Sequence, residues 1–122
     1  MAGTKAATPP TRIGLMGFGR IGRNVFRQVR GRADIDIAAI VDIADPAALA
    51  YLLEYDTIFG RYPDDVTFAD GHLVIGKLRI PMLTDPNPGD VDWGALGVDI
   101  VVQATRKHRT AVECARHLER GA

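Results

Sequence analysis

The chain has 122 residues, which is enough for one domain with a buried core but leaves no room for a second domain of similar size. Its 15 Lys and Arg residues balance its 15 Asp and Glu residues, so overall charge does not favour nucleic acid or an anionic membrane as a partner. A single cysteine, Cys114, excludes an internal disulfide, and no apolar run has the length of a membrane span, so we expect a cytoplasmic protein.

The first eleven residues are predicted to form a disordered tail. They are small and polar, include Pro9 and Pro10, and lack the apolar stretch of a signal peptide. We therefore expect the folded domain to span residues 12–122.

The next segment predicts a buried strand, a glycine turn and a helix. The strand covers Ile13–Met16, and the helix runs from about Arg20 to Gly31, where glycine supplies a C-cap. Between them, Gly17, Gly19 and Gly22 match the pattern G-x-G-x-x-G. In this pattern one glycine makes the tight turn, one lets the backbone approach a pyrophosphate, and one lets the helix pack on the strand.

A second apolar strand is expected over residues 35–42, which completes a strand, helix and strand unit. It ends at Asp42, 20 residues beyond Gly22, where a dinucleotide-binding domain places the carboxylate that binds the adenosine ribose. A carboxylate bonds a 2′-hydroxyl but repels a 2′-phosphate, so Asp42 favours NAD over NADP. Two alternatives remain open here: a glycine turn with no ligand, and an aspartate that only caps a turn.

Four arginines follow one another on a single face of the first helix. Arg20, Arg23, Arg27 and Arg30 lie opposite the apolar side chains of the helix, and we expect most of this face to meet water.

The remaining elements continue the alternation of strands and helices. A helix should begin at Pro46, with Asp45 as its N-cap, and end near Tyr55. The later predictions are a turn-like segment 56–63, a hairpin of strands 66–69 and 73–75 around Asp70–His72, a strand 77–82, a loop 84–89, a single helical turn 93–96, a strand 99–104, and a helix 110–120 capped by Gly121. The whole pattern indicates an α/β fold, a Rossmann-type doubly wound and mainly parallel sheet that is incomplete on its C-terminal side and carries a small β-hairpin insertion.

These residues resemble the N-terminal NAD-binding region of the phosphorylating glyceraldehyde-3-phosphate dehydrogenases. The similarity runs in unbroken order over residues 12–122. It is carried by residues 17–23, residues 40–43, residues 49–56 with Gly60 and Arg61, and residues 98–105 with 117–122.

The resemblance implies a partial NAD(P)-binding Rossmann domain in which the backbone of Arg20 and Ile21 meets the pyrophosphate and Asp42 binds the ribose. Thr105 matches a family threonine beside the cofactor crevice, although its hydroxyl would equally close the start of the last helix. The full set of expected cofactor-binding residues is Gly17, Phe18, Gly19, Arg20, Ile21, Gly22, Asp42, Thr105 and Arg106.

For the intact enzyme, the resemblance implies the glycolytic oxidation of glyceraldehyde 3-phosphate with phosphate, through a thioester, with hydride transfer to NAD in a homotetramer. The family's nucleophilic cysteine and its partner histidine have no counterpart in this chain. The catalytic domain is therefore absent from these 122 residues, and we expect the chain alone to be inactive.

Two positions depart from the family. Met16 replaces a frequent asparagine before the glycine turn, which we interpret as a change of packing. Arg106 stands where a glycine usually follows the threonine, so its side chain either crowds the cofactor or reaches the pyrophosphate with its charge.

The chain offers no substitute for the missing catalytic residues. Cys114 has no histidine placed to activate it by sequence, and His72, His108 and His117 have no metal-like spacing with it. We expect structural or solvent-exposed roles for all three histidines, and no metal site.

Two other functions stay open at this level. One is the cofactor domain of a related sugar-phosphate aldehyde dehydrogenase, such as erythrose-4-phosphate dehydrogenase. The other is a non-enzymatic nucleotide- or RNA-binding module, which only the basic segment 106–109 specifically suggests.

Overall fold

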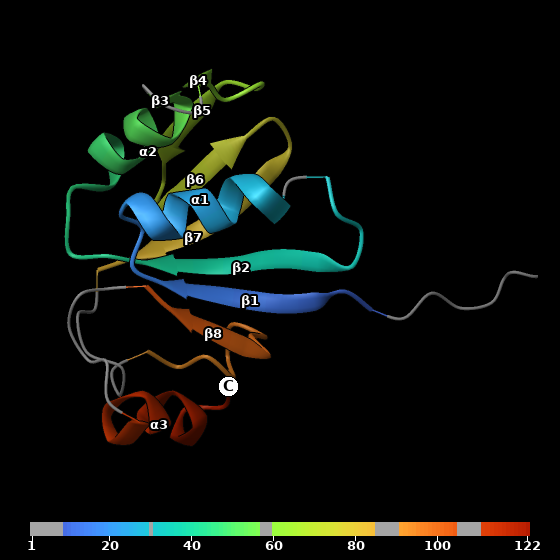
Figure 1. Cartoon of the computed structure of the whole chain (residues 1–122), viewed down its shortest axis with the longest axis vertical. Coiled ribbons are helices and arrows are strands. Elements are labelled where there is room, and N and C mark those ends of the chain that lie inside the picture. Colours follow the sequence, from blue (N-terminus) through green and yellow to red (C-terminus); the bar gives the residue numbers. More distant parts are fainter. Residues whose placement is uncertain (1–8, 30, 57–59, 85–90, 105–110) are drawn as a thin grey trace, which may run out of the picture.

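A six-stranded sheet forms the centre of the molecule (Figure 1). The computed structural model of the chain describes residues 9–29, 31–56, 60–84, 91–104 and 111–122. In spatial order, the strands are β5 (Val66–Ala69), β6 (His72–Ile75), β7 (Leu78–Leu83), β2 (Ile35–Val41), β1 (Thr11–Met16) and β8 (Ile100–Gln103). The neighbours β7, β2, β1 and β8 pair in parallel, whereas β5 and β6 extend the sheet as an antiparallel hairpin. The expected mainly parallel α/β sheet with a hairpin insertion is confirmed.

The strand order creates a reversal of winding direction between β1 and β8. From β1 the chain proceeds to β2 and then β7 on one side, and it returns to the other side of β1 with β8. In doubly wound sheets such a reversal leaves a crevice at the carboxyl ends of the two central strands.

Two apolar cores cover the two faces of the sheet. The first packs Leu15 and Ile40 against helices α1 (Arg20–Val29) and α2 (Pro46–Glu54), and the second packs Met16 and neighbouring residues of β2 against Trp93. Successive residues of a strand point to opposite faces, which is why Leu15 and Met16 enter different cores. Helix α3 (Ala111–Glu119) lies near β8, at the opposite end of Figure 1 from α2.

Trp93 is the largest fully buried side chain among the described residues, and the sequence did not indicate its importance. Its indole lies over β1 at Gly14, where an added Cβ would approach the ring to 2.4 Å. The expected helical turn at residues 93–96 is present as a tight turn, with Leu96 N donating to Trp93 O at 3.2 Å. The absence of a side chain at Gly14, in the middle of β1, leaves the space that the Trp93 indole occupies.

Local signals for turns and caps are confirmed. Asp45 caps α2 by accepting from Ala48 N at 3.2 Å, with Pro46 in the first helical turn. Asp70 and Gly71 both have positive φ in the β5–β6 turn, as a two-residue hairpin connection requires.

The segment expected to be only turn-like between residues 56 and 63 contains two short strands. β3 (Tyr55–Asp56) pairs antiparallel with β4 (Gly60–Arg61). Thr11 also belongs to β1, one residue inside the expected tail, because its N–H donates to Asp34 O at 2.9 Å.

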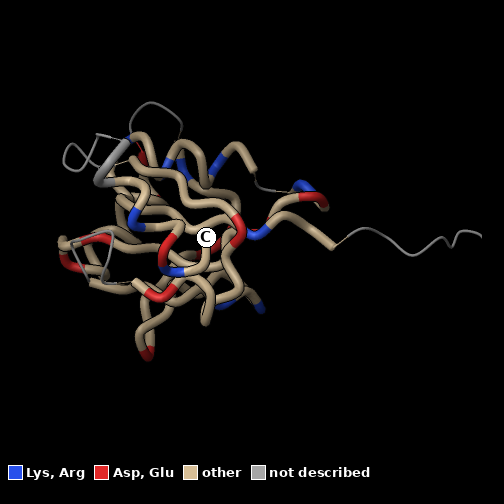
Figure 2. Tube along the Cα trace, turned by 90° about the horizontal axis from the view of Figure 1, so that it is seen from below, with Lys and Arg blue, Asp and Glu red and all other residues tan. Residues whose placement is uncertain are grey.

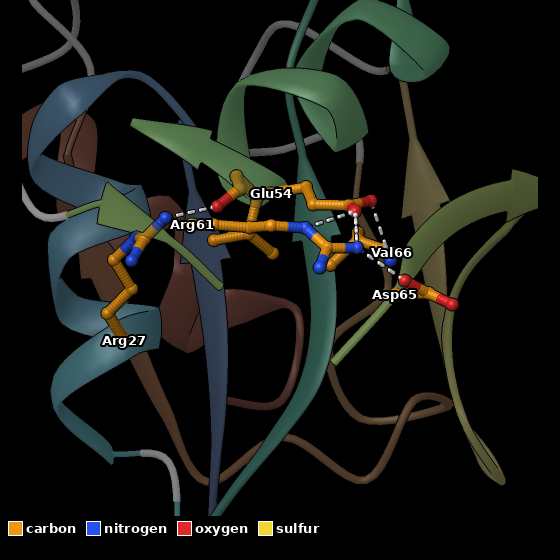
Figure 3. A network of polar contacts seen from close by, with 6 residues as sticks. Arg27, Glu54, Arg61, Asp65 and Val66 are labelled. Carbon is orange, nitrogen blue, oxygen red and sulfur yellow. Dashed lines mark hydrogen bonds and ion pairs between the residues drawn. The ribbon is translucent and has the colours of Figure 1, made fainter. Parts of the chain in front are cut away.

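The carboxylate of Glu54 is buried and links α2 to two of the strands that follow it. Glu54 accepts from Val66 N at 3.0 Å through one oxygen and from Arg61 Nη2 at 2.8 Å through the other. Figure 3 shows Arg61 between Glu54 and Asp65, which accepts from the same guanidinium at 2.7 Å. The network ties the end of α2 to β4 and to the start of β5.

Charged residues are distributed over the described surface. Figure 2 shows Lys and Arg as well as Asp and Glu on the described chain, and the full sequence has 15 residues of each sign. Among the described residues, no helix is long and apolar enough to cross a membrane.

Candidate cofactor-binding site

The glycine turn lies where the carboxyl ends of three parallel strands meet. Gly17 N donates to Val41 O at 2.7 Å, and Ala104 N donates to Met16 O at 2.7 Å. These bonds bring the ends of β2, β1 and β8 to one edge of the sheet. This is the position at which doubly wound sheets bind ligands.

Glycine is present at the three positions of the turn for three different structural reasons. Gly17 has φ of 107°, which favours glycine over other residues. A Cβ on Gly22 would lie 2.2 Å from Gly17 O, so the helix packs on the strand only without a side chain there. A Cβ on Gly19 would meet no atom of the described residues within 4 Å, so packing within the described part of the chain does not require this glycine. These are the three roles expected for a turn that receives a pyrophosphate.

Exposure divides the expected contact residues into two groups. Gly19, Arg20 and Ile21 are exposed at the start of α1, whereas Gly17, Phe18 and Gly22 are buried. Helix α1 begins with Arg23 N donating to Gly19 O at 2.9 Å, so the N–H groups before Arg23 have no partner within the helix. Such an exposed helix N-terminus attracts phosphate through its free N–H groups and its dipole.

Asp42 follows β2 and lies against the glycine turn. Its Oδ2 accepts from Phe18 N at 2.7 Å, and its Oδ1 accepts from Ala44 N at 2.9 Å. The second bond is the turn-capping role considered from the sequence. A carboxylate has about four lone-pair positions, so two backbone bonds leave acceptor capacity for ribose hydroxyls. Capping and ribose binding are therefore compatible in this partly buried residue.

Phe18 takes part in the turn without offering a surface to a ligand. Its side chain is fully buried and meets Phe26 edge to face, with the ring centroids 5.7 Å apart. Both polar backbone groups are engaged, because Asp42 binds its N–H and Arg23 Nη1 donates to its carbonyl at 3.1 Å.

The arginine face of α1 differs from the expectation that most of it meets water. Only Arg20 is exposed among the described members of the set, Arg23 and Arg27 are partly buried, and Arg30 lies outside the described residues. Arg23 is bound to the glycine turn, while Arg27 donates to the carbonyl oxygens of Leu53 and of Gly60, the latter at 3.1 Å. A guanidinium has five N–H donors, and here backbone carbonyls of the glycine turn, of α2 and of β4 accept from them. Spacing on a helix does not reveal such partners.

Several predicted residues take no part in the described site. Thr105, Arg106 and His108 lie outside the described residues, so their roles remain predictions. Cys114 is partly buried on α3. Across the described ranges, no group of three His, Cys, Asp or Glu side chains could hold a metal ion.

The two described histidines have structural contacts. His72 Nδ1 lies 2.8 Å from Asp70 O in the hairpin turn. His117 is buried, with Nδ1 2.9 Å from Trp93 Nε1 and Nε2 2.7 Å from Gln103 Oε1. The expected structural role of His117 is thereby confirmed.

Comparisons with known proteins agree with this geometry. Residues 11–111 match the family model described as glyceraldehyde 3-phosphate dehydrogenase, NAD binding domain. The chain is 44% identical over 112 residues to glyceraldehyde-3-phosphate dehydrogenase 1 of Streptomyces arenae, covering 91% of this chain and 34% of that protein. It is 40% identical over 111 residues to the enzyme of Geobacillus stearothermophilus, covering 91% of this chain and 33% of that one. Glyceraldehyde-3-phosphate dehydrogenase A of Escherichia coli is also 40% identical over 111 residues, with 91% and 34% covered. The chain thus spans about a third of the length of these curated relatives.

Proposed function

The chain belongs to the glyceraldehyde-3-phosphate dehydrogenase family, and from this premise we propose that it is the NAD-binding part of an enzyme that oxidises glyceraldehyde 3-phosphate with phosphate. The observation that carries the proposal is the contrast between two glycines. Packing against Gly17 requires a glycine at position 22, whereas Gly19 is exposed and follows Phe18, whose N–H donates to the carboxylate of Asp42. That combination leaves one face of the turn accessible to a dinucleotide.

The described residues fit NAD at two points. The exposed N–H groups at Gly19, Arg20 and Ile21 suit a pyrophosphate, and the carboxylate of Asp42 suits an adenosine ribose with a free 2′-hydroxyl. When bound, NAD supplies the nicotinamide that accepts hydride from the substrate. The protein's part in this region is to bind and orient the cofactor.

The aldehyde chemistry requires a nucleophile that this chain does not provide in an activated form. Cys114 lies on α3, and the nearest described histidine on that helix, His117, already contacts Trp93 and Gln103. We therefore propose that thioester formation depends on residues beyond these 122. We further propose a cytoplasmic homotetramer for the intact enzyme. The single cysteine supports the compartment, and the family resemblance supports the assembly.

The proposal is tested by calorimetric titration of the chain with NAD and with NADP. NAD should bind, and NADP should bind more weakly because its 2′-phosphate meets the carboxylate of Asp42. Absence of NAD binding, or a preference for NADP, would contradict the proposed function.

A further inference from the structure

Both peptide groups that flank Gly19 are held by one residue, Arg23. The carbonyl of Phe18 accepts from Arg23 Nη1 at 3.1 Å, and the carbonyl of Gly19 accepts from Arg23 N at 2.9 Å. The first of these bonds comes from a side chain and is not part of the regular hydrogen bonding of the helix. Arg23 therefore acts on the exposed glycine from one turn further along α1.

The planar peptide between Phe18 and Gly19 carries the effect of the side chain to the surface. A trans peptide points its C=O and N–H in opposite directions, and none of the described peptides is cis. Because the Phe18 carbonyl points toward Arg23, the Gly19 N–H of the same peptide points away from Arg23. The preceding peptide is held separately, by Asp42 on the Phe18 N–H.

Without the guanidinium, little would hold this peptide in place. Gly19 has no side chain, and among the described residues no atom lies within 4 Å of a Cβ placed on it, so no side-chain packing restrains this residue. Phe18 itself is immobilised by full burial against Phe26. The freedom that remains lies in the peptide that joins a buried residue to an exposed one.

The environment of Arg23 is unfavourable for a residue with only a packing role. Its Nε is buried and has no hydrogen-bond partner among the described residues. Burial lowers the pKa of the Arg23 guanidinium, and attraction to Asp56 opposes this effect. Buried polar atoms without partners are uncommon in folded proteins and call for an explanation.

We propose that Arg23 is a positioning residue for the pyrophosphate of the dinucleotide, which it serves by fixing the Phe18–Gly19 peptide so that the Gly19 N–H faces the exposed side of the turn. The inference rests on the proposed function for its ligand. According to this inference, the Arg23 side chain helps to determine NAD affinity without contacting NAD.

The test compares Arg23→Met with Arg27→Met in the full chain. Arg27 lies one turn further along the same helix and also donates to backbone carbonyls, but to those of Leu53 and Gly60 instead of the glycine turn. Both substitutions remove an arginine that bridges two segments, so both should lower the melting temperature. Only Arg23→Met should affect the glycine turn.

Two measurements decide the outcome. The NMR order parameter of the Gly19 amide should fall from about 0.85 to below about 0.6 in Arg23→Met and stay unchanged in Arg27→Met. NAD affinity should fall about tenfold in Arg23→Met only, which corresponds to ordering the backbone of roughly one residue on binding. If Arg23→Met does not fold, Arg23→Gln replaces it, since its amide is too short to reach the Phe18 carbonyl.

A simple charge effect gives a different result. In that case the loss of affinity would disappear in about 1 M salt, where the Debye length is about 3 Å, and the Gly19 order parameter would not change. Either of these results would overturn the inference, as would equal NAD affinities for Arg23→Met and Arg27→Met. If the unmodified chain did not bind NAD, the proposed function would fail, and the order parameter would still show whether Arg23 holds the peptide.

Discussion

The indole Nε1 of Trp93 donates a hydrogen bond to Nδ1 of His117 at 2.9 Å, and both side chains are buried. An indole nitrogen is only a donor, so Nδ1 must be the acceptor and Nε2 carries the proton. Nε2 then donates to Gln103 Oε1 at 2.7 Å. Through these two bonds the turn after residue 91, helix α3 and strand β8 are joined, and β8 ends beside the glycine turn.

Replacing Trp93 with Phe should destabilise the fold. The substitution keeps an aromatic ring over Gly14 but removes the donor, which leaves His117 Nδ1 as a buried acceptor without its partner. We expect a loss of about 1–3 kcal/mol in the free energy of unfolding, measured by urea denaturation. A loss smaller than about 0.5 kcal/mol would show that the hydrogen bond contributes little beyond packing.

Alanine substitutions at Gly19 and at Gly22 should have different effects on stability and on NAD affinity. Gly22→Ala places a Cβ 2.2 Å from Gly17 O, a backbone atom, so α1 must shift and stability should fall by roughly 1–3 kcal/mol. Gly19→Ala meets no atom of the described residues within 4 Å and should fold normally, yet its Cβ would lie on the side where we expect the pyrophosphate and should weaken NAD binding. Thermal unfolding and NAD titration of both variants separate the two effects. Unchanged NAD affinity in Gly19→Ala would place the pyrophosphate elsewhere.

Asp42→Asn should weaken NAD binding and narrow its preference over NADP. The amide removes the negative charge that repels a 2′-phosphate and one of the two equivalent acceptor oxygens. Asp45→Asn is the matched control, because Asp45 is exposed at the N-cap of α2 and asparagine caps helices equally well. Calorimetry should show a changed ratio of NAD affinity to NADP affinity only for Asp42→Asn. The same ratio in both variants would exclude Asp42 as the ribose ligand.

The Glu54 network predicts a specific dependence of stability on pH. The hydrogen bonds from Val66 N–H and from Arg61 hold the pKa of the Glu54 carboxyl below its ordinary value of 4.5. A carboxyl with a lowered pKa in the folded state stabilises the fold above its unfolded pKa, and this contribution is lost as the pH falls through the folded pKa. Glu54→Gln should therefore be less stable than the unmodified chain at pH 7, and the difference should shrink below about pH 4.5.

Asp65→Asn serves as the control for this experiment. The Asp65 side chain is 85% exposed, so its ion pair with Arg61 is expected to add little to stability. Melting temperatures from pH 7 to pH 3 should show the large, pH-dependent difference only for Glu54→Gln. A constant difference across this range would show that ionisation of Glu54 is not its cause.

The chain alone should not oxidise glyceraldehyde 3-phosphate. Cys114 is the only cysteine in the sequence, and both ring nitrogens of His117, the described histidine on the same helix, have contacts with Trp93 and Gln103. We expect no phosphate-dependent formation of NADH, measured by absorbance, and NAD binding unaffected by Cys114→Ser. An activity that Cys114→Ser abolished would assign Cys114 a catalytic role and contradict this prediction.

Features that depend on local backbone conformation and on side-chain alternation could be predicted from the amino-acid sequence. The glycine spacing predicted the turn, because Gly17 needs a positive φ and Gly22 needs close packing within six residues of one another. Asp70–Gly71 predicted the hairpin and Asp45–Pro46 the start of α2 for the same local reason. The apolar runs of β1 and β2 predicted buried parallel strands, since both faces of such strands are covered. The apolar run of β8 predicted a buried strand as well, but β8 lies at the edge of the sheet, and its residues are exposed or partly buried.

The contacts between polar side chains could not be predicted from the sequence and are visible only in the folded chain. Trp93 and His117 are 24 residues apart, Arg27 binds carbonyls on another helix and strand, and Glu54 accepts hydrogen bonds from Arg61 of β4 and from Val66 of β5. The helical period predicts a solvent-facing Arg23 because it gives the direction of a side chain, but not which carbonyl lies within its reach. An apolar side chain can pack against any apolar neighbour, so the periodicity of apolar residues in the sequence is enough to predict which face of an element is buried. A hydrogen bond requires one particular partner at about 3 Å, and the chain brings that partner into place only by folding.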